Sequence, residues 1–366
     1  MRTERSVLPL PVTVDSIDAQ WLTLALSQRH PGVEVVESCI DEVIRGTSTK
    51  IRVVLRYNAA GREAALPPTM IVKGGFEAHS PLFGFMYRSE MRCYRDLLPI
   101  MDLNAPRAFF SAEDPGSHQA LVIMEDLNAR HVTFPSAQTP FDYPQEARFL
   151  DALARLHAQW WGRPQLRDEG ELGWVLTQFG AASREYQNRY LAPEVWDSYM
   201  AKPRGAATPK ALHDRERMRA ALDALAEFHE SAPLTLTHGD THLGNLYIER
   251  DGTPGFLDMQ VRRSPWYQDV AYHMTAALDV IDRRKWEQAL LSFYLGRLAA
   301  HGVASPPGFD EAWACYRREL VYGLFIFLIN ETRFQTEQTN TAYAVRFAMA
   351  AIDHRTFDLL LRQEPV

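Results

Sequence analysis

Apolar and polar positions in the first third of the chain follow patterns that predict two helices and several strands. Asp15-Ser16 begins an amphipathic helix that ends near His30-Pro31-Gly32. Ser80-Pro81 predicts the start of a second helix, which runs to about Leu98. The strand-like stretches cover residues 33–44, 50–57, 69–73 and 120–124. We therefore expect this part of the chain to be rich in β-structure.

Beyond Leu127 the hydrophobic spacing becomes that of helices, and it stays so over most of the remaining chain. The most apolar run, residues 320–329, is expected to be a buried core helix, because a transmembrane helix needs roughly 20 apolar residues. The pattern predicts an α+β chain of two lobes. Residues 1–127 would form a β-rich N-terminal lobe with an N-terminal helix, and residues 128–366 a larger, mostly helical lobe.

Composition fits an ordinary globular protein and narrows the range of partners. Of the 366 residues 46% are hydrophobic, and the net charge of −7 argues against a nucleic acid or an anionic membrane surface as partner. The three cysteines, Cys39, Cys93 and Cys315, show no metal-ligand spacing, and residues 1–14 lack the apolar core of a secretory signal. We expect a cytoplasmic protein whose partner is a small molecule.

The candidate chemistry lies in residues 237–245, Thr-His-Gly-Asp-Thr-His-Leu-Gly-Asn, and in Leu-Asp-Met-Gln at residues 257–260. Asp240 and Asn245 have the Asp-x-x-x-x-Asn spacing of kinase catalytic loops, and Asp258 follows beyond a predicted hairpin. Phosphoryl transfer requires a carboxylate that accepts the substrate hydroxyl proton, and oxygen ligands that hold magnesium. The spacing predicts an ATP-dependent small-molecule kinase with Asp240 as base and with Asn245 and Asp258 as Mg²⁺ ligands.

The register of the predicted hairpin can be worked out from its turn. Asp251-Gly252 favours a two-residue type I′ turn, so cross-strand partners should have residue numbers with the same sum as 251 and 252. That register places Asn245 opposite Asp258, with Cα atoms roughly 4.5 Å apart. Two oxygen ligands side by side suit Mg²⁺. The alternative is an ordinary hairpin with polar ends.

Lys73 and Glu90 supply the half of a kinase site that the catalytic segment lacks. Lys73 ends the third predicted strand, from which it can reach nucleotide phosphates, although a lysine at a strand end is often simply solvated. Glu90 lies on an otherwise apolar or aromatic helical stripe, where a carboxylate is unfavourable unless it is paired. An ion pair between Lys73 and Glu90 accounts for both observations.

Two further segments are candidates for contact with the nucleotide. Residues 45–50, Arg-Gly-Thr-Ser-Thr-Lys, lie where a phosphate-covering loop belongs, and Gly46 and Ser48 are its candidate contacts. Because the segment has a single glycine, a plain β-turn fits almost equally well. Glu125 to Leu127 lie at the expected joint between the lobes, where backbone groups can bond an adenine edge.

His238 and His242 allow another interpretation, a metal-dependent hydrolase, because His-x-Asp-x-His resembles part of a zinc site. Zinc normally takes three or four ligands, and no further histidine cluster lies nearby in the sequence. A buried histidine that supports the loop through its ring N–H groups fits better. Asp269 is expected to accept backbone N–H bonds from the same loop.

At these residues the chain resembles the aminoglycoside-phosphotransferase and choline-kinase-like superfamily, and within it most of all the ecdysteroid-kinase-like phosphotransferases. The resemblance spans residues 17–272 and is carried by residues 90–94, 97–99, 156–158, 238–245, 255–260 and 266–272. It implies a protein-kinase-like bilobal fold that transfers the ATP γ-phosphate to a hydroxyl of a small molecule. The site residues implied are Asp240 as base, Asn245 and Asp258 as magnesium ligands, Lys73 and Glu90 as the phosphate-positioning pair, and Glu125 to Leu127 as the adenine hinge.

Two features depart from the family pattern without removing a catalytic group. Met259 stands where family members often carry an aromatic residue, and the loop around Gly46 lacks a rich glycine pattern. Both departures concern the expected affinity for the nucleotide.

The acceptor is expected against the helical lobe, near residues 174–199 and 316–343. A polycationic aminoglycoside would call for a cluster of carboxylates, whereas residues 311–353 balance glutamates with arginines and are rich in Tyr and Phe. This favours a neutral or apolar alcohol. The alternatives are an aminoglycoside-type antibiotic phosphotransferase and a nucleotide-binding pseudokinase that acts as a regulatory partner. The intact Asp240, Asn245, Asp258 and Lys73 argue against the pseudokinase.

Overall fold

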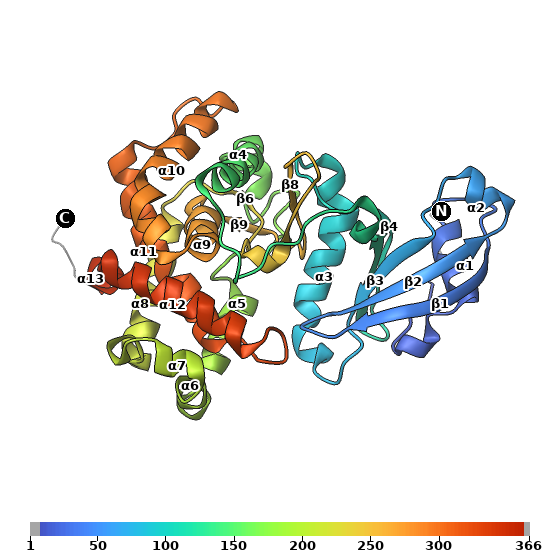
Figure 1. Cartoon of the computed structure of the whole chain (residues 1–366), viewed down its shortest axis with the longest axis horizontal. Helices are drawn as coiled ribbons and strands as arrows, with labels where there is room; N and C mark the ends of the chain where they lie inside the picture. The colour runs from blue at the N-terminus through green and yellow to red at the C-terminus, as the bar shows by residue number, and fades with distance from the viewer. Residues whose placement is uncertain (1–7, 362–366) are drawn as a thin grey trace. The chain divides into compact units, whose positions relative to one another are not determined.

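The computed structural model describes residues 8–361, and the chain folds into two compact units. One unit takes in the chain up to Ile100 together with Ala105–Val132, and the other takes in Met101–Asn104 and the chain from Thr133. Figure 1 shows their elements. The functional division into lobes between residues 127 and 128 stays a prediction.

The first unit is built on a five-stranded antiparallel sheet with the strand order β1-β2-β3-β5-β4. Its strands are β1 (Val35–Ile44), β2 (Thr49–Tyr57), β3 (Thr69–Gly74), β4 (Ala108–Asp114) and β5 (Gln119–Glu125). The sequence pattern does not predict β4, because only its first residues are apolar and Ser111, Glu113 and Asp114 follow. The other strands lie where the pattern places them.

Alternation along these strands gives the sheet two different faces. Ile51 of β2 and Val72 of β3 belong to a buried core that also contains Trp21 and Leu22 of helix α1 (Ala19–Ser27). Lys73 directly follows Val72 and therefore points to the opposite face. On that face α3 (Gly84–Arg92) packs on β4 and β5.

The first helix begins later than the sequence pattern suggests. Asp18 is its N-cap, and the Asp18 carboxylate accepts the backbone N–H of Trp21 at 2.7 Å. Asp15 and Ser16, the expected cap, instead belong to a short 3-10 turn. The expected start was wrong because Asp and Ser favour turns as well as helix caps, and spacing alone does not separate the two.

The second unit is mostly helical. Its helices are α4 (Tyr143–Trp160), α5 (Ala181–Tyr190), α6 (Pro193–Met200), α7 (Pro203–Ala207), α8 (Arg215–Glu230), α9 (Tyr267–Ala277), α10 (Val280–Ala300), α11 (Phe309–Ile329), α12 (Glu337–Asp353) and α13 (Thr356–Leu361). Helices α9, α11 and α12 pack against one another (Figure 1). Residues 320–329 lie in the last part of α11 and are largely buried, as predicted.

Two short sheets carry the candidate site within this unit. In one, β6 (Thr235–Thr237) pairs with β9 (Arg262–Ser264), and in the other β7 (Leu246–Ile248) pairs with β8 (Pro254–Phe256). The α+β class and its order, strands first and helices after, are confirmed. Among residues 8–361 no helix has both the length and the hydropathy to cross a membrane.

Candidate active site

The candidate catalytic loop, residues 238–242, follows β6 and turns sharply at Gly239. Gly239 has a φ of +88°, and a Cβ atom there would lie 2.3 Å from the backbone oxygen of Gln260. A residue with a side chain fits neither this conformation nor this close approach. Glycine therefore lets the chain reverse beside Gln260 immediately before Asp240.

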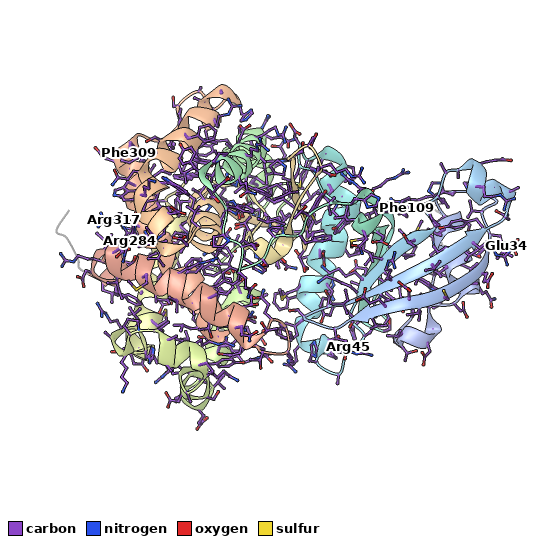
Figure 2. The ribbon with its side chains drawn as sticks, viewed as in Figure 1. Glu34, Arg45, Phe109, Arg284, Phe309 and Arg317 are labelled. Atoms are coloured by element: carbon purple, nitrogen blue, oxygen red, sulfur yellow. The ribbon has the colours of Figure 1, made fainter. Side chains whose placement is uncertain are left out.

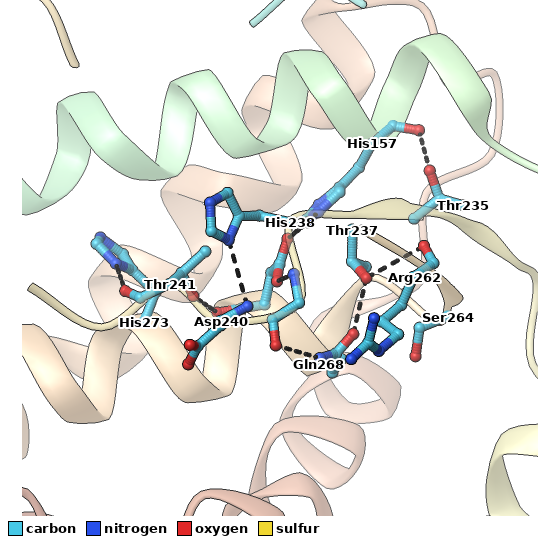
Figure 3. A network of polar contacts seen from close by, with 12 residues as sticks. His157, Thr235, Thr237, His238, Asp240, Thr241, Arg262, Ser264, Gln268 and His273 are labelled. Carbon is cyan, nitrogen blue, oxygen red and sulfur yellow. Dashed lines mark hydrogen bonds and ion pairs between the residues drawn. The ribbon is translucent and has the colours of Figure 1, made fainter. Parts of the chain in front are cut away.

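Asp269, on α9, anchors the loop. Its carboxylate oxygens accept the backbone N–H groups of His238 at 2.6 Å and of Gly239 at 2.9 Å, and His157 Nε2 lies 3.2 Å from Oδ2. His157 and His238 are labelled in Figure 3. Burial alone would raise the pKa of Asp269, but the hydrogen bonds from His157 and Gly239 hold that pKa below its usual range. The predicted role of Asp269 as acceptor for the loop N–H groups is confirmed.

The Asp240 carboxylate is held by two side-chain hydrogen bonds and still reaches solvent. Tyr272 Oη donates to Oδ1 and Asn245 Nδ2 donates to Oδ2, both at 2.9 Å. The Asp240 side chain remains 32% exposed. Because each carboxylate oxygen has a second lone pair, Asp240 can accept a further hydrogen bond in a fixed orientation.

His238 and His242 use their ring nitrogens within the protein. His238 Nε2 lies 2.7 Å from the backbone oxygen of Leu257, and Nδ1 accepts the N–H of Asp240 at 3.3 Å. Burial lowers the pKa of His238, which favours its neutral form. His242 Nδ1 accepts the N–H of Gly244 at 3.0 Å, and Nε2 contacts the Gln335 amide at 3.0 Å. These contacts are those expected of histidines that hold the loop, and His242 Nε2 also lies 3.6 Å from Asp240 Oδ2.

The hairpin is present, but its predicted register was wrong by one residue. Leu246 pairs with Phe256 and Ile248 with Pro254. Glu249 N–H donates to Thr253 O at 3.0 Å, which leaves a three-residue turn that ends with Gly252 at a φ of +85°. A left-handed glycine after a type I turn is the three-residue alternative to the expected type I′ turn. The shift follows from this extra residue.

The corrected register changes the neighbours of the two proposed metal ligands. Asn245 lies opposite Leu257, whose N–H donates to Asn245 O at 2.7 Å, and not opposite Asp258. Asp258 follows the strand with a φ of +53°, a left-handed conformation that is uncommon for aspartate. Strained residues of this kind concentrate at functional sites. The left-handed backbone conformation of Asp258, and not cross-strand pairing with Asn245, therefore sets its position.

In the first unit, Lys73 and Glu90 form the expected ion pair. Lys73 Nζ lies 2.5 Å from Glu90 Oε1, and both side chains are buried. The pair joins β3 to α3. Its formation explains why a carboxylate is tolerated on an otherwise apolar helix face.

The loop between β1 and β2 is tied to the segment around α3. His79 Nε2 lies 3.1 Å from Gly46 O, and Tyr87 Oη donates to Thr47 O. Arg45, labelled in Figure 2, pairs with Glu77 at 3.1 Å. Ser48 is buried beside these contacts. The loop that contains Gly46 and Ser48 is thus held through its carbonyl groups, on the element that carries Glu90.

The expected hinge segment begins where β5 ends. Glu125 Oε2 accepts from Arg130 Nη1 at 3.2 Å, and Leu127 is buried. Between them Asp126 accepts from Arg52 Nε at 2.7 Å and caps a short 3-10 turn through Asn128 N–H. These contacts fix the backbone of Glu125 to Leu127 at the C-terminal end of β5.

Tyr272 is a site residue to which the sequence pattern assigns no role. It is buried on α9, three residues after Asp269, so both side chains lie on the same helix face. Asp269 accepts hydrogen bonds from the backbone of the loop, and Tyr272 donates a hydrogen bond to the Asp240 carboxylate. That shared face is the signal in the sequence that marks Tyr272.

The chain is similar to one known protein family and to several proteins of known structure. The model of the ecdysteroid kinase-like family matches residues 47–303. No curated protein sequence matches the chain significantly. An ethanolamine kinase of Plasmodium vivax aligns with a TM-score of 0.50 at 11% identity, over 88% of this chain and 82% of its own. A protein from Ralstonia eutropha, proposed to be an aminoglycoside phosphotransferase, aligns with a TM-score of 0.50 at 15% identity, over 90% of this chain and 95% of its own. At these identities the likeness shows the fold, which is protein-kinase-like.

Proposed function

Because the chain belongs to the ecdysteroid kinase-like family, we propose that it is an ATP-dependent kinase that phosphorylates a hydroxyl group of a small molecule. Family membership supports a small-molecule phosphotransferase. One observation carries the finer proposal: the Asp240 carboxylate is oriented by Tyr272 and Asn245 and still reaches solvent. A carboxylate held in this way has the orientation and the free lone pairs of a general base.

In this proposal Asp240 accepts the proton of the acceptor hydroxyl as that oxygen attacks the γ-phosphorus of ATP. The bond between the γ-phosphorus and the bridging oxygen breaks, and ADP leaves with the bond electrons. The hydrogen bonds from Tyr272 and Asn245 keep the carboxylate in one rotamer. His238 is not a competing base, because its ring nitrogens contact two backbone groups, Leu257 O and the N–H of Asp240.

Asn245 and Asp258 are the residues that would hold Mg²⁺. The Asn245 amide nitrogen donates to Asp240, which leaves the amide oxygen as the possible ligand atom. An amide oxygen and a carboxylate suit Mg²⁺, which usually takes few protein ligands. When bound, magnesium would neutralise charge on the nucleotide phosphates.

The first unit carries the residues that we propose for the nucleotide. Lys73 would bind phosphate oxygens while Glu90 keeps its ammonium group in place. Gly46 and Ser48 would contact the phosphates, and backbone groups from Glu125 to Leu127 would bond the adenine edge. Hydrogen bonds already hold the loop around Gly46 and the end of β5 at Glu125. Segments that are preorganised in this way lose less conformational entropy when a ligand binds, which supports these assignments.

We propose a neutral or apolar alcohol as the acceptor. The Asp240 carboxylate lies at an aromatic cluster of the second unit: Tyr272 donates to it, stacks on Phe327 with centroids 5.5 Å apart and lies 6.4 Å from Tyr322. Aromatic surfaces bind apolar skeletons by area burial. A polycationic aminoglycoside would instead favour a cluster of carboxylates beside the base, so the antibiotic phosphotransferase remains the second candidate.

An ADP-release screen with Mg·ATP over hydroxylated metabolites, steroids and antibiotics tests the proposal. We expect release that depends on the acceptor, with neutral or apolar alcohols preferred, and an Asp258→Ala variant with a weakened magnesium dependence. Two results would contradict the kinase: no binding of ATP by the wild type, or stoichiometric zinc in the purified protein. An unchanged magnesium dependence in Asp258→Ala would remove Asp258 from the site.

A further inference from the structure

Arg262 lies against the catalytic loop of the second unit. It begins β9 and pairs with Thr237 of β6, two residues before Gly239. A Cβ atom on Gly239 would lie 3.1 Å from Arg262 Cγ, so the arginine stem packs directly on the loop (Figure 3). Asp240 and Tyr322 of α11 are the groups that interact electrostatically with its guanidinium. The stem of Arg262 therefore lies beside the residue that precedes the proposed base.

The guanidinium of Arg262 has little to bind within the protein. Its one hydrogen bond runs from Nη1 to the backbone oxygen of Val261 at 3.3 Å, and among the described residues no carboxylate lies within ion-pair distance. Arg262 is only 8% exposed. Its Nε and Nη2 atoms are not fully buried, so they face accessible space. Five donors are thus served by a single acceptor.

The other buried arginines of this unit have more acceptors: Arg346 donates to two backbone carbonyls, and the remaining three also pair with carboxylates. Arg263, the next residue, donates to Val175 O at 2.8 Å, to Leu166 O at 2.7 Å and to Asp168 at 2.9 Å. Arg204 is bound by Glu337 and two carbonyls, and Arg283 by Glu287 and Asp353. Burying an unpaired charge is unfavourable. A partner from outside the chain would compensate the buried charge of Arg262.

We propose that Arg262 determines acceptor specificity: its guanidinium donates hydrogen bonds to an oxygen-bearing group of the acceptor, neutral or anionic, beside the hydroxyl that Asp240 deprotonates. A cationic acceptor is repelled by the same group. The inference rests on the proposed kinase function and narrows it. It selects alcohols that carry a second oxygen near the reacting hydroxyl.

The first test uses the protein without acceptor and compares two neighbouring arginines of similar burial. If Arg262 serves a ligand, Arg262→Met has the wild-type Tm or a higher one, because a buried charge with a single carbonyl acceptor stabilises the fold little. Arg263→Met is the matched control, and its Tm falls by roughly 5–10 °C as three acceptors lose their donor. An equal fall in both variants would make Arg262 structural and overturn the proposal.

The second test measures ADP release with a polyhydroxylated neutral steroid, a hydroxy acid and kanamycin. Arg262→Gln is expected to lower kcat/KM by about 10- to 100-fold for the first two, to change little for kanamycin, and to leave the KM for ATP unaltered. Arg262→Glu should shift preference further toward kanamycin. An equal loss of kcat for every acceptor and for slow ATP hydrolysis would show that Arg262 acts on the phosphoryl group instead. A wild type that binds no ATP would refute the kinase itself, while the Tm comparison would still decide whether Arg262 is structural.

Discussion

Glu146 offers a quantitative test of how the catalytic loop is supported. It lies on α4 with no exposed surface, and neither carboxylate oxygen has a hydrogen-bond partner. His273 Nε2 is 3.4 Å from Oε2, and the other ring nitrogen of His273 lies 2.9 Å from Thr241 O, next to Asp240. Burial raises the pKa of Glu146 to about 8 and lowers the pKa of His273 to about 4. Both groups are therefore neutral at pH 7.

The sign of the pH dependence follows from the raised pKa of Glu146. The folded state keeps a proton that the unfolded state releases near pH 4.5, so this contribution to stability is complete below that pH and is lost as pH rises toward 8. The loss is about 1.4 kcal/mol per pH unit, hence about 2 kcal/mol between pH 6 and pH 8. In Glu146→Gln the neutral amide has no proton to lose, and its N–H can face His273 as the protonated acid does.

Urea unfolding followed by circular dichroism at pH 6, 7 and 8 measures this difference. Glu146→Gln should gain about 2 kcal/mol over wild type between the first and the last pH. Glu337→Gln is the control: burial alone would raise the pKa of Glu337, but its hydrogen bonds with Arg204 hold that pKa below its usual range. Its difference from wild type should therefore stay constant over the same range. A constant difference for Glu146→Gln as well would refute the reasoning.

Three further substitutions test the loop itself. Tyr272→Phe removes a hydrogen bond to the charged Asp240, so kcat should fall about 10- to 100-fold with the affinity for ATP unchanged, as steady-state kinetics would show; equal kcat would remove Tyr272 from the site. Gly239→Ala should lose most activity, since its Cβ would meet Gln260 O at 2.3 Å, whereas the open helical Gly296→Ala should stay active in the same assay. Asp269→Asn should lower the stability measured by urea unfolding by about 1–3 kcal/mol, because an amide cannot accept both loop N–H groups; unchanged stability would contradict that anchoring role.

Local chemistry and regular spacing made much of the fold and site predictable from the sequence. The strand β2 follows period-2 alternation, β3 is marked by a short apolar run, and Glu90 stood out because a carboxylate interrupts an apolar helical stripe. A buried carboxylate is unfavourable without a partner, and the structure contains the predicted ion pair between Glu90 and Lys73. The expectation that Asp269 accepts N–H bonds from the catalytic loop is confirmed as well.

What the sequence could not predict depends on backbone geometry or on distant partners. Asp251-Gly252 is compatible with two turns that differ by one residue, and the turn that forms places Leu257 opposite Asn245 in place of Asp258. Tyr272 meets Asp240 across 32 residues of sequence, and only the packing of α9 brings them together. That the Arg262 guanidinium has a single hydrogen-bond acceptor among the described residues likewise depends on neighbours that are distant in the sequence.

Comparison of Asp240→Asn with the wild type tests the central claim most directly, with ATP binding and transfer of labelled γ-phosphate measured on the same samples. The account predicts that the variant binds ATP like the wild type but transfers label to the acceptor at least 10²-fold more slowly, roughly the least that a lost general base removes. Transfer at a similar rate in both proteins, or label that appears only as inorganic phosphate with the wild type, would contradict it.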